Sequence, residues 1–200
     1  MKKTVSTLFI VSMLIMSVLC FTGCGSYQIA EAKQSNSRTY ACDYHTLAFN
    51  TKISTNVHDN DVEISGNLFT FVTDPLKMTD SSGNVLATAD DTYNLVSQDD
   101  HAILVDDKFE IAVHGNVDLL GESYQLHDES GNTVGYAEFN TTSTSGAVYN
   151  KDNEVIATYD SSFGFNDYEV TIVDNDLCSD EAILMIVASY VSDYQADHDD

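Results

Sequence analysis

The sequence predicts a mainly β fold, a closed or nearly closed antiparallel β-barrel of about twelve strands around a C-terminal hydrophobic helix. From Leu47 onward, short segments alternate apolar and polar residues, as in Phe109, Ile111 and Val113. Such alternation is typical of strands with one buried face, and turn-forming Asp, Asn, Gly and Ser separate the segments. Near the C-terminus, residues 182–191 carry no charge. A helix that is apolar all round must be enclosed by protein.

The N-terminus has the features of a secretory signal. Lys2 and Lys3 precede a largely apolar run from Thr4 to Phe21, and no acidic residue occurs before position 31. A basic start followed by a short apolar core is the pattern of an exported chain. The run is at the short end for a bilayer span, so a retained anchor helix is the less favoured alternative.

The residues Phe21, Thr22, Gly23 and Cys24 resemble the bacterial lipobox, in which an aliphatic and two small residues precede a lipidated cysteine. Phe21 departs from the usual leucine. The resemblance implies that residues 1–23 are a signal peptide and that Cys24 carries acyl chains such as palmitate. Two acyl chains hold a protein firmly on a membrane. We therefore expect a lipid-anchored protein on the extracytoplasmic face of the cell membrane; an ordinary signal cleaved nearby is the alternative.

The remaining chain divides into a tether and one domain. Gly25 to Tyr44 is polar and short of large aliphatic residues, so residues 24–44 are expected to be the lipidated cysteine and a flexible tether. Residues 45–200 are expected to form the barrel, which is long enough for one sizeable core.

The chain is strongly acidic, with a formal net charge of −24. Removal of residues 1–23 takes away two lysines and no carboxylate, which changes the charge to −26. Such a field repels nucleic acid and anionic lipid headgroups, so nucleic-acid binding is excluded. Collection of cations, a basic partner, and simple solubility in the exterior all remain compatible with this charge.

Two cysteines, Cys42 and Cys178, remain once residues 1–23 are removed and Cys24 is modified. In an oxidising exterior they could form a disulfide, which would stabilise the fold by roughly 4 kcal/mol in the chain-entropy model. Two separate thiols are the alternative.

Three segments share a hairpin signature, in which Asp or Asn opens the turn and Gly or Asn follows three residues later. The pairs are Asp80 and Gly83, Asp128 and Gly131, and Asn150 and Asn153. A side-chain oxygen at the first position can accept hydrogen bonds from the following amides. The last position requires a positive φ, which Gly and then Asn adopt with least strain.

The C-terminal segment is expected to be a buried helix over about 180–194. Ser179 can cap it, and Asp180 and Glu181 fall in its first turn, where the helix dipole favours them. The residues expected in the core are Ile183, Leu184, Met185, Ile186, Val187 and Val191. A buried strand is the alternative.

Candidate chemistry is sparse. Asp59, Asp61 and Glu63 alternate like metal ligands, but Ile64 stands where a calcium loop requires glycine. No Gly-x-Ser-x-Gly motif and no close histidine pair is present. The spacing of 13 residues between His101, His114 and His127 is consistent with strand spacing alone. We expect no cofactor and no catalysis.

The hairpins within 124–135 and 148–157, together with the segment 168–174 and the apolar helix, resemble the LURP-one-related family. That family belongs with the tubby C-terminal domain and the phospholipid scramblases, and the similarity covers roughly 66–194. The resemblance implies a twelve-stranded barrel wound around a hydrophobic C-terminal helix. It implies no site, because Lys77, Lys108 and Lys151 are isolated and offer no basic patch for phosphoinositides.

These observations predict an exported, lipid-anchored, non-enzymatic surface module. We expect a monomer that binds an unidentified protein or small ligand, or that has a structural role. An envelope lipid-handling protein is the alternative that the resemblance prompts, and a cation-dependent enzyme is a further one.

Overall fold

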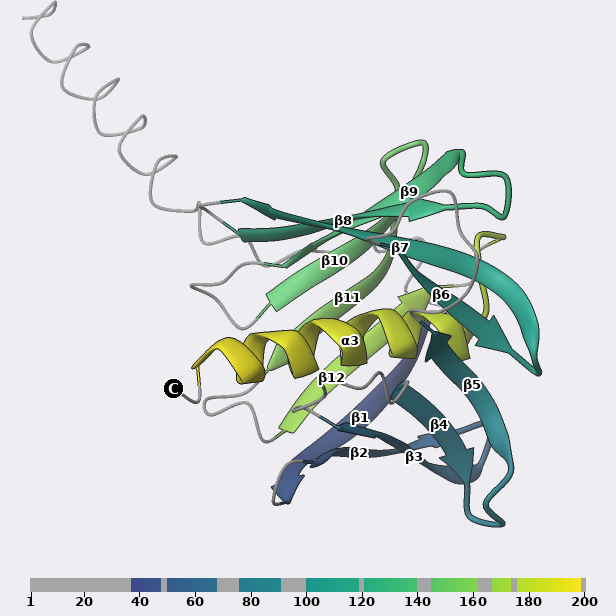
Figure 1. Cartoon of the computed structure of the whole chain (residues 1–200), viewed down its shortest axis with the longest axis vertical. Helices are drawn as coiled ribbons and strands as arrows, with labels where there is room; N and C mark the ends of the chain where they lie inside the picture. Colours follow the sequence, from purple (N-terminus) through teal and green to yellow (C-terminus); the bar gives the residue numbers. More distant parts are fainter. Residues whose placement is uncertain are drawn as a thin grey trace, which may run out of the picture.

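Twelve antiparallel strands in the described part of the chain close into a barrel around a helix (Figure 1). The computed structural model describes residues 37–47, 50–67, 76–90, 100–118, 121–139, 145–161, 167–173 and 176–198. The strands are β1 (Ser37–Leu47), β2 (Asn50–Val57), β3 (Asn60–Asn67), β4 (Leu76–Asp80), β5 (Val85–Asp90), β6 (Asp100–Val105), β7 (Lys108–Asp118), β8 (Gly121–His127), β9 (Thr133–Phe139), β10 (Ser145–Asn150), β11 (Val155–Ser161) and β12 (Asp167–Val173). The helix is α3 (Asp180–His198). The predicted fold class is confirmed.

The strand order is the simplest one that a barrel can have. Each strand pairs with its neighbours in the sequence, and β1 pairs with β12 to close the sheet. Every connection therefore joins adjacent antiparallel strands, and three of these connections are the predicted hairpins. Because β1 pairs with β12, every strand has a partner strand on both sides.

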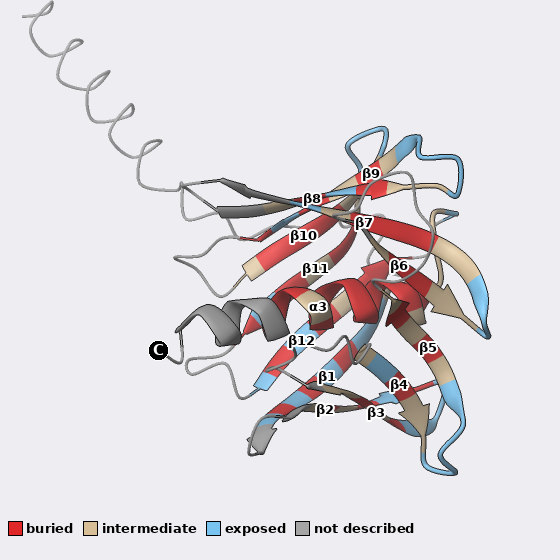
Figure 2. Cartoon of the chain, in the orientation of Figure 1, coloured by how far each residue is buried: buried red, intermediate tan, exposed pale blue. Residues whose placement is uncertain are grey.

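Helix α3 runs through the lumen, and its buried residues form the centre of the core (Figure 2). The six residues predicted for the helix core are between 0 and 1% exposed: Ile183, Leu184, Met185, Ile186, Val187 and Val191. Tyr190 stacks on Phe139 with ring centroids 4.0 Å apart, so packing continues toward the later part of the helix. The segment is helix and not strand, and it extends to His198, beyond the predicted end at about 194.

Strand β1 corrects the predicted domain boundary. It begins at Ser37, so residues 37–44 belong to the barrel and not to the tether predicted over 24–44. Tyr40, Cys42 and Tyr44 are buried and alternate with exposed residues such as Asp43. The alternation was present in the sequence, but the polar residues between the inward-facing ones gave the segment a tether-like composition.

The three predicted hairpin turns have the expected geometry. Gly83, Gly131 and Asn153 have φ values of 84°, 81° and 61°. The amide of Gly83 donates to the carbonyl of Asp80 at 2.9 Å, and the other two turns repeat this bond. Two shorter turns, 58–59 and 106–107, were not predicted; all four of their residues have positive φ although none is glycine.

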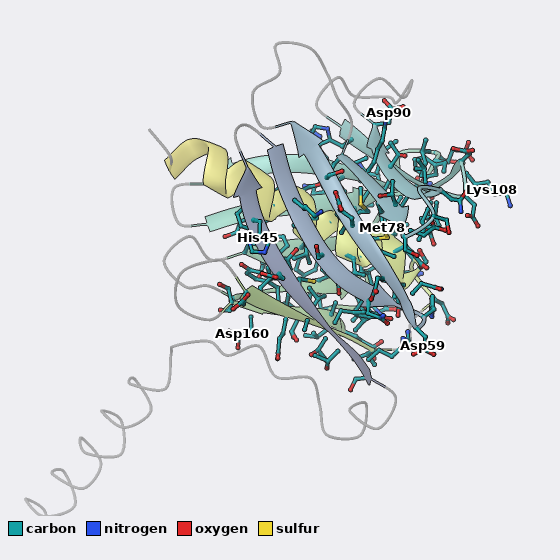
Figure 3. The ribbon with its side chains drawn as sticks, turned by 90° about the horizontal axis from the view of Figure 1, so that it is seen from below. His45, Asp59, Met78, Asp90, Lys108 and Asp160 are labelled. Atoms are coloured by element: carbon teal, nitrogen blue, oxygen red, sulfur yellow. The ribbon has the colours of Figure 1, made fainter. Side chains whose placement is uncertain are left out.

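The short turns between the strands gather at one end of the barrel. The connections 58–59, 81–84, 106–107, 128–132 and 151–154 all lie at the end where β1 begins and α3 enters, which we name the turn end (Figure 1). In Figure 3, Asp59 and Lys108 mark the turn end and His45 marks the opposite end. The helix runs from the turn end toward the opposite end, so the two termini of the described chain lie at opposite ends of the barrel.

No helix among the described residues is both long and apolar enough to cross a membrane. The predicted signal peptide at 1–23 and the predicted lipidation site, Cys24, lie outside the described residues.

Candidate functional site

An ionic cluster with a buried carboxylate, Asp180, and an exposed partner, Arg38, ties the first turn of α3 to β1 at the turn end. The carboxylate of Asp180 accepts two hydrogen bonds from Arg38, with Nε 2.6 Å from Oδ2 and Nη2 2.7 Å from Oδ1. The hydroxyl of Tyr40 donates to the same carboxylate. Asp180 is only 6% exposed, and a buried carboxylate is tolerated when it is paired and hydrogen-bonded in this way.

The protonation states of this cluster follow from its contacts. Burial raises the pKa of Asp180, but the hydrogen bonds from Arg38 and Tyr40 and the positive charge of Arg38 outweigh it, so its pKa is lowered. Burial, followed by the hydrogen bond to Asp180, raises the pKa of Tyr40 well above its ordinary value. Asp180 is therefore an anion and Tyr40 a neutral donor, and their bond joins the start of α3 to β1.

Two further contacts fix the start of the helix from other parts of the barrel. Glu110 on β7 accepts hydrogen bonds from the amide and the hydroxyl of Ser179, both at 2.7 Å. The hydroxyl oxygen of Ser179 accepts from the amide of Ala182 at 3.2 Å, which confirms the predicted helix cap. His58 Nε2 lies 3.4 Å from Glu181 Oε1.

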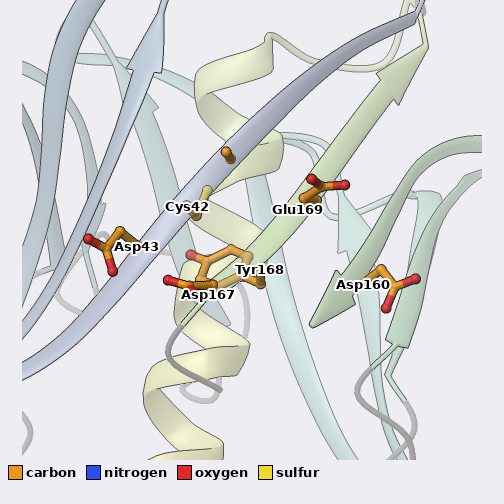
Figure 4. Close-up of a pocket in the computed structure, with 7 residues that line it drawn as sticks. Cys42, Asp43, Asp160, Asp167, Tyr168 and Glu169 are labelled. Carbon is orange, nitrogen blue, oxygen red and sulfur yellow. The ribbon is translucent and has the colours of Figure 1, made fainter. Parts of the chain in front are cut away.

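A groove of about 470 Å³ on the outside of the barrel gathers carboxylates across β11, β12 and β1 (Figure 4). Asp43 faces Asp167 in the strand register, and Asp160 faces Glu169. Like charges directly opposite each other on neighbouring strands are destabilising. The groove therefore has a negative potential that attracts cations and basic groups in general.

Cys42 and Cys178 are both free thiols in the structure, which agrees with the second of the two alternatives, two separate thiols. Cys42 points into the barrel from β1, and its Sγ donates to the carbonyl oxygen of Tyr40 at 3.9 Å. Cys178 lies beside Glu110 on β7, which stands across the barrel from β1 in the strand order.

Neither thiol has the character of a nucleophile. Burial raises the pKa of Cys42 to about 11. Burial, and then the charges of Glu110 and Asp180, raise the pKa of Cys178 to about 12. Both groups are therefore protonated thiols at neutral pH, and reactive cysteines require the thiolate.

The three candidate metal ligands do not converge. Asp59 lies in the turn 58–59, Asp61 accepts a hydrogen bond from the Asn56 amide at 3.1 Å, and Glu63 Oε2 lies 2.6 Å from Lys52 Nζ. Asp61 and Glu63 line a second outer groove of about 650 Å³ with Asp80, whereas Asp59 does not. Among the residues that the structure describes, no group of three or more acidic, histidine or cysteine side chains could hold a metal ion.

The histidine spacing reflects the strands. His101, His114 and His127 lie on the consecutive strands β6, β7 and β8, and the last two stack with ring centroids 5.8 Å apart. The next two strands carry a second stack, in which Tyr136 and Tyr149 are 4.5 Å apart. Sequence reasoning missed both stacks, although period-two alternation predicts that His114, Tyr136 and Tyr149 face outward.

Sequence reasoning also missed Arg38, because it fell within the predicted tether. Its position two residues before Tyr40 places it on the inward face of β1. This alternation along β1 was the sequence signal that could have identified Arg38. The partner, Asp180, is 142 residues away, and no spacing rule connects them.

Comparison with known proteins gives information about the fold and none about a functional site. No protein-family model and no curated protein matches this sequence. The structure is similar to the X-ray structure of a protein from Arabidopsis thaliana, AT5G01750, with a TM-score of 0.50 and 12% sequence identity. The match covers 78% of this chain and 90% of the plant chain. At this identity the similarity shows a shared fold, a β-barrel with a helix in its lumen.

Proposed function

We propose that this protein is an exported, lipid-anchored, non-enzymatic module of the cell surface that binds a partner through the outside of its barrel. The filled lumen is the observation that supports binding through the outside of the barrel, whereas the anchor rests on the lipobox-like residues 21–24. Residues 182–188 of α3 are at most 1% exposed, and the core residues of the strands pack against them. An interior of this kind leaves no room for a ligand unless the helix leaves, so recognition falls to the outer surface.

The charge of that surface restricts the kind of partner. The outer groove on β11, β12 and β1 carries Asp43, Asp160, Asp167 and Glu169. Its field favours cationic groups on a protein or small ligand and disfavours nucleic acid. The same field keeps the barrel away from anionic headgroups, so an anchor at Cys24 would hold the barrel near the membrane without laying it on the bilayer.

We further propose that the chain is a member of the LURP-one-related and tubby C-terminal-like group. The closed barrel, the central helix and the similarity to the plant structure support this membership. The alternative function, handling of envelope lipids, draws its support from the same kinship and from the expected anchor. The packed lumen counts against a lipid held inside the barrel.

The anchor is tested by mass spectrometry of the native N-terminus and by partition of the protein into detergent. The expected result is an acylated Cys24 as the first residue, and loss of detergent partition in Cys24→Ala. The matched control is Cys20→Ala, which alters a cysteine within the signal run and leaves partition unchanged. An unmodified N-terminus at another residue contradicts the anchor.

Lipid handling and non-enzymatic binding are separated by vesicle flotation of protein that lacks residues 1–24. We expect no saturable binding to zwitterionic, anionic or sterol-containing vesicles. Saturable binding to one lipid class supports the alternative function.

Catalysis is tested by a screen for hydrolase and transferase activity. Metal-dependent turnover that is abolished by substitution of one carboxylate contradicts the non-enzymatic assignment.

A further inference from the structure

A third groove, of about 530 Å³, lies at the turn end of the barrel. It is formed by the hairpin between β10 and β11, the beginning of β9, the end of β12 and the connection into α3. Its volume falls within the range of sites that hold small ligands. Half of its lining residues are apolar, namely Val134, Val155, Ile156, Val173 and Leu177.

The apolar part of this groove is an extension of the core that remains accessible. Val134, Val155 and Leu177 are half-buried, and Val134 and Leu177 pack against the core. A Cβ atom added at Gly135 would lie 3.1 Å from Cδ2 of Leu177, so the Leu177 side chain lies directly against β9. A side chain that covered these three residues would remove further apolar area from water.

The N-terminal segment enters the barrel beside this groove. The first described residue of the chain, Ser37, pairs with Val173, which lines the groove. Residues 25–36 lead from Cys24 to this point, and Ile29 is the one large aliphatic residue among them. Ile29 stands eight residues before Ser37. An extended chain of that length spans up to about 26 Å, so the groove lies within reach of Ile29.

The charges of the groove and of the segment are complementary. The groove has three carboxylates, from Asp152, Glu154 and Asp176, and one cation, Lys151. The segment 25–36 contains Lys33, four residues after Ile29. Because the segment is covalently attached beside the groove, its effective concentration there is on the order of millimolar. It therefore binds this groove more readily than a separate partner of the same chemistry.

We propose that residues 27–33 of this chain bind in the groove. The Ile29 side chain covers Val155 and Leu177, and Lys33 lies near the carboxylates of Asp152 and Asp176. The segment between Cys24 and the barrel is then bound along much of its length. A consequence, which rests on the proposed lipidation of Cys24, is that the acyl anchor is held close to the turn end. The contact itself does not depend on the anchor.

The direct test is methyl NMR of the purified mature protein in detergent. We expect nuclear Overhauser effects between the Ile29 methyl groups and those of Val155 and Leu177. Their absence overturns the proposal. A mixture of differently labelled molecules shows whether the contact is within one chain, and effects between two copies overturn the proposal as well.

The second test is the rate at which trypsin cleaves after Lys33 in the folded mature protein, followed by mass spectrometry. Val155→Asp is expected to accelerate this cleavage by about tenfold, because proteolysis follows the population of the unbound segment. The matched control is Val85→Asp. Val85 is the first residue of β5 after the turn 81–84, as Val155 is the first residue of β11 after the turn 151–154, and it is 46% exposed and outside the groove. This control should leave the cleavage rate unchanged.

A matched pair of substitutions within the segment completes the test. Ile29→Asp is expected to accelerate cleavage as Val155→Asp does, whereas Gln28→Asp adds the same charge to a side chain that points the other way in an extended segment. Equal acceleration in the two variants overturns the proposal, because it shows an effect of charge on trypsin alone. Unchanged rates in Ile29→Asp and Val155→Asp overturn it too. If Val155→Asp does not fold, the pair at positions 28 and 29 and the methyl contacts decide, and both readouts apply whether or not Cys24 is acylated.

Discussion

At the scale of single residues, the turns use one device repeatedly. The Asp80 carboxylate accepts hydrogen bonds from the amides of Ser82 and Asn84 at 2.8 Å, and Asp128 does the same in its own turn at 2.9 Å. The side-chain amides of Asn84 and Asn132, followed by the backbone bonds, lower the pKa of the two carboxyl groups. The negative charges of Asp80 and Asp128 are therefore part of the turn structure.

The positive φ of Gly83 predicts the effect of a methyl group there. No atom lies within 4 Å of an added Cβ, so Gly83→Ala changes the backbone energy and not the packing. An L-residue in this region costs about 1–2 kcal/mol, and we expect that loss in the free energy of unfolding measured with urea. The control is Gly115→Ala, whose added Cβ makes ordinary contacts with Tyr124 at 3.6 Å. A loss at Gly115 equal to that at Gly83 would contradict the backbone explanation.

The free thiols of Cys42 and Cys178 predict that reducing agents leave the fold unchanged. We expect the same melting temperature with and without dithiothreitol, because no cross-link restrains the unfolded chain. A disulfide closing so long a loop would contribute about 4 kcal/mol, which gives a shift of several degrees. A fall of several degrees in the melting temperature on reduction would show that the two cysteines form a disulfide.

At the scale of elements, α3 is the centre around which the strands close. Its first turn is held by ionic bonds and its body by apolar packing, and both faces of the body are buried. A helix without a polar face has no stable place in water, so it and the barrel depend on each other. Loss of contacts in the helix should therefore reduce the stability of the whole domain.

Leu184 tests this dependence. It is 1% exposed, and Leu184→Ala leaves a cavity that the closed sheet cannot readily fill. We expect a loss of about 2–5 kcal/mol in the free energy of unfolding, measured with urea. Ser189→Ala serves as the control on the same helix, because it removes a hydroxyl bonded to the Met185 carbonyl at 2.9 Å and no core volume. Equal losses at the two positions would argue against a close-packed lumen.

The elements also show how far sequence reasoning extends. Alternation, turn chemistry and the uncharged segment 182–191 were local signals, and they predicted the strands, three of the turns and the buried helix. The start of β1 was missed because its inward residues alternate with polar ones in a polar region. The Arg38–Asp180 pair and the outer groove depend on β1 meeting β12 and α3, which only closure of the barrel brings about. The turns 58–59 and 106–107 were missed because they place ordinary residues where glycine is expected.

At the scale of the whole molecule, the dominant property is a net charge of −24 on a 200-residue chain. The two outer grooves show that part of this charge is concentrated on neighbouring strands, at Asp160 and Glu169 for example. Repulsion of this kind opposes the compact state and is screened by salt.

Added salt is therefore expected to stabilise the protein. The melting temperature should rise between low ionic strength and 0.5 M sodium chloride, and calcium chloride at the same ionic strength should give the same rise. Screening treats the two salts alike, whereas a cation that binds the native state adds its binding free energy. A clearly larger rise in melting temperature with calcium would indicate a bound cation, with Asp59, Asp61 and Glu63 as candidate ligands. It would support the alternative of a cation-dependent enzyme.

The passage of the chain through the barrel from one end to the other has a practical consequence. Strand β1 begins at the turn end, and α3, with 19 residues, ends at the opposite end after about 28 Å of helix. A fluorophore fused behind the last residue would thus be displaced from the start of β1 by the length of the lumen. Energy transfer from a dye in the bilayer to that fluorophore would report whether the molecule stands upright or lies flat.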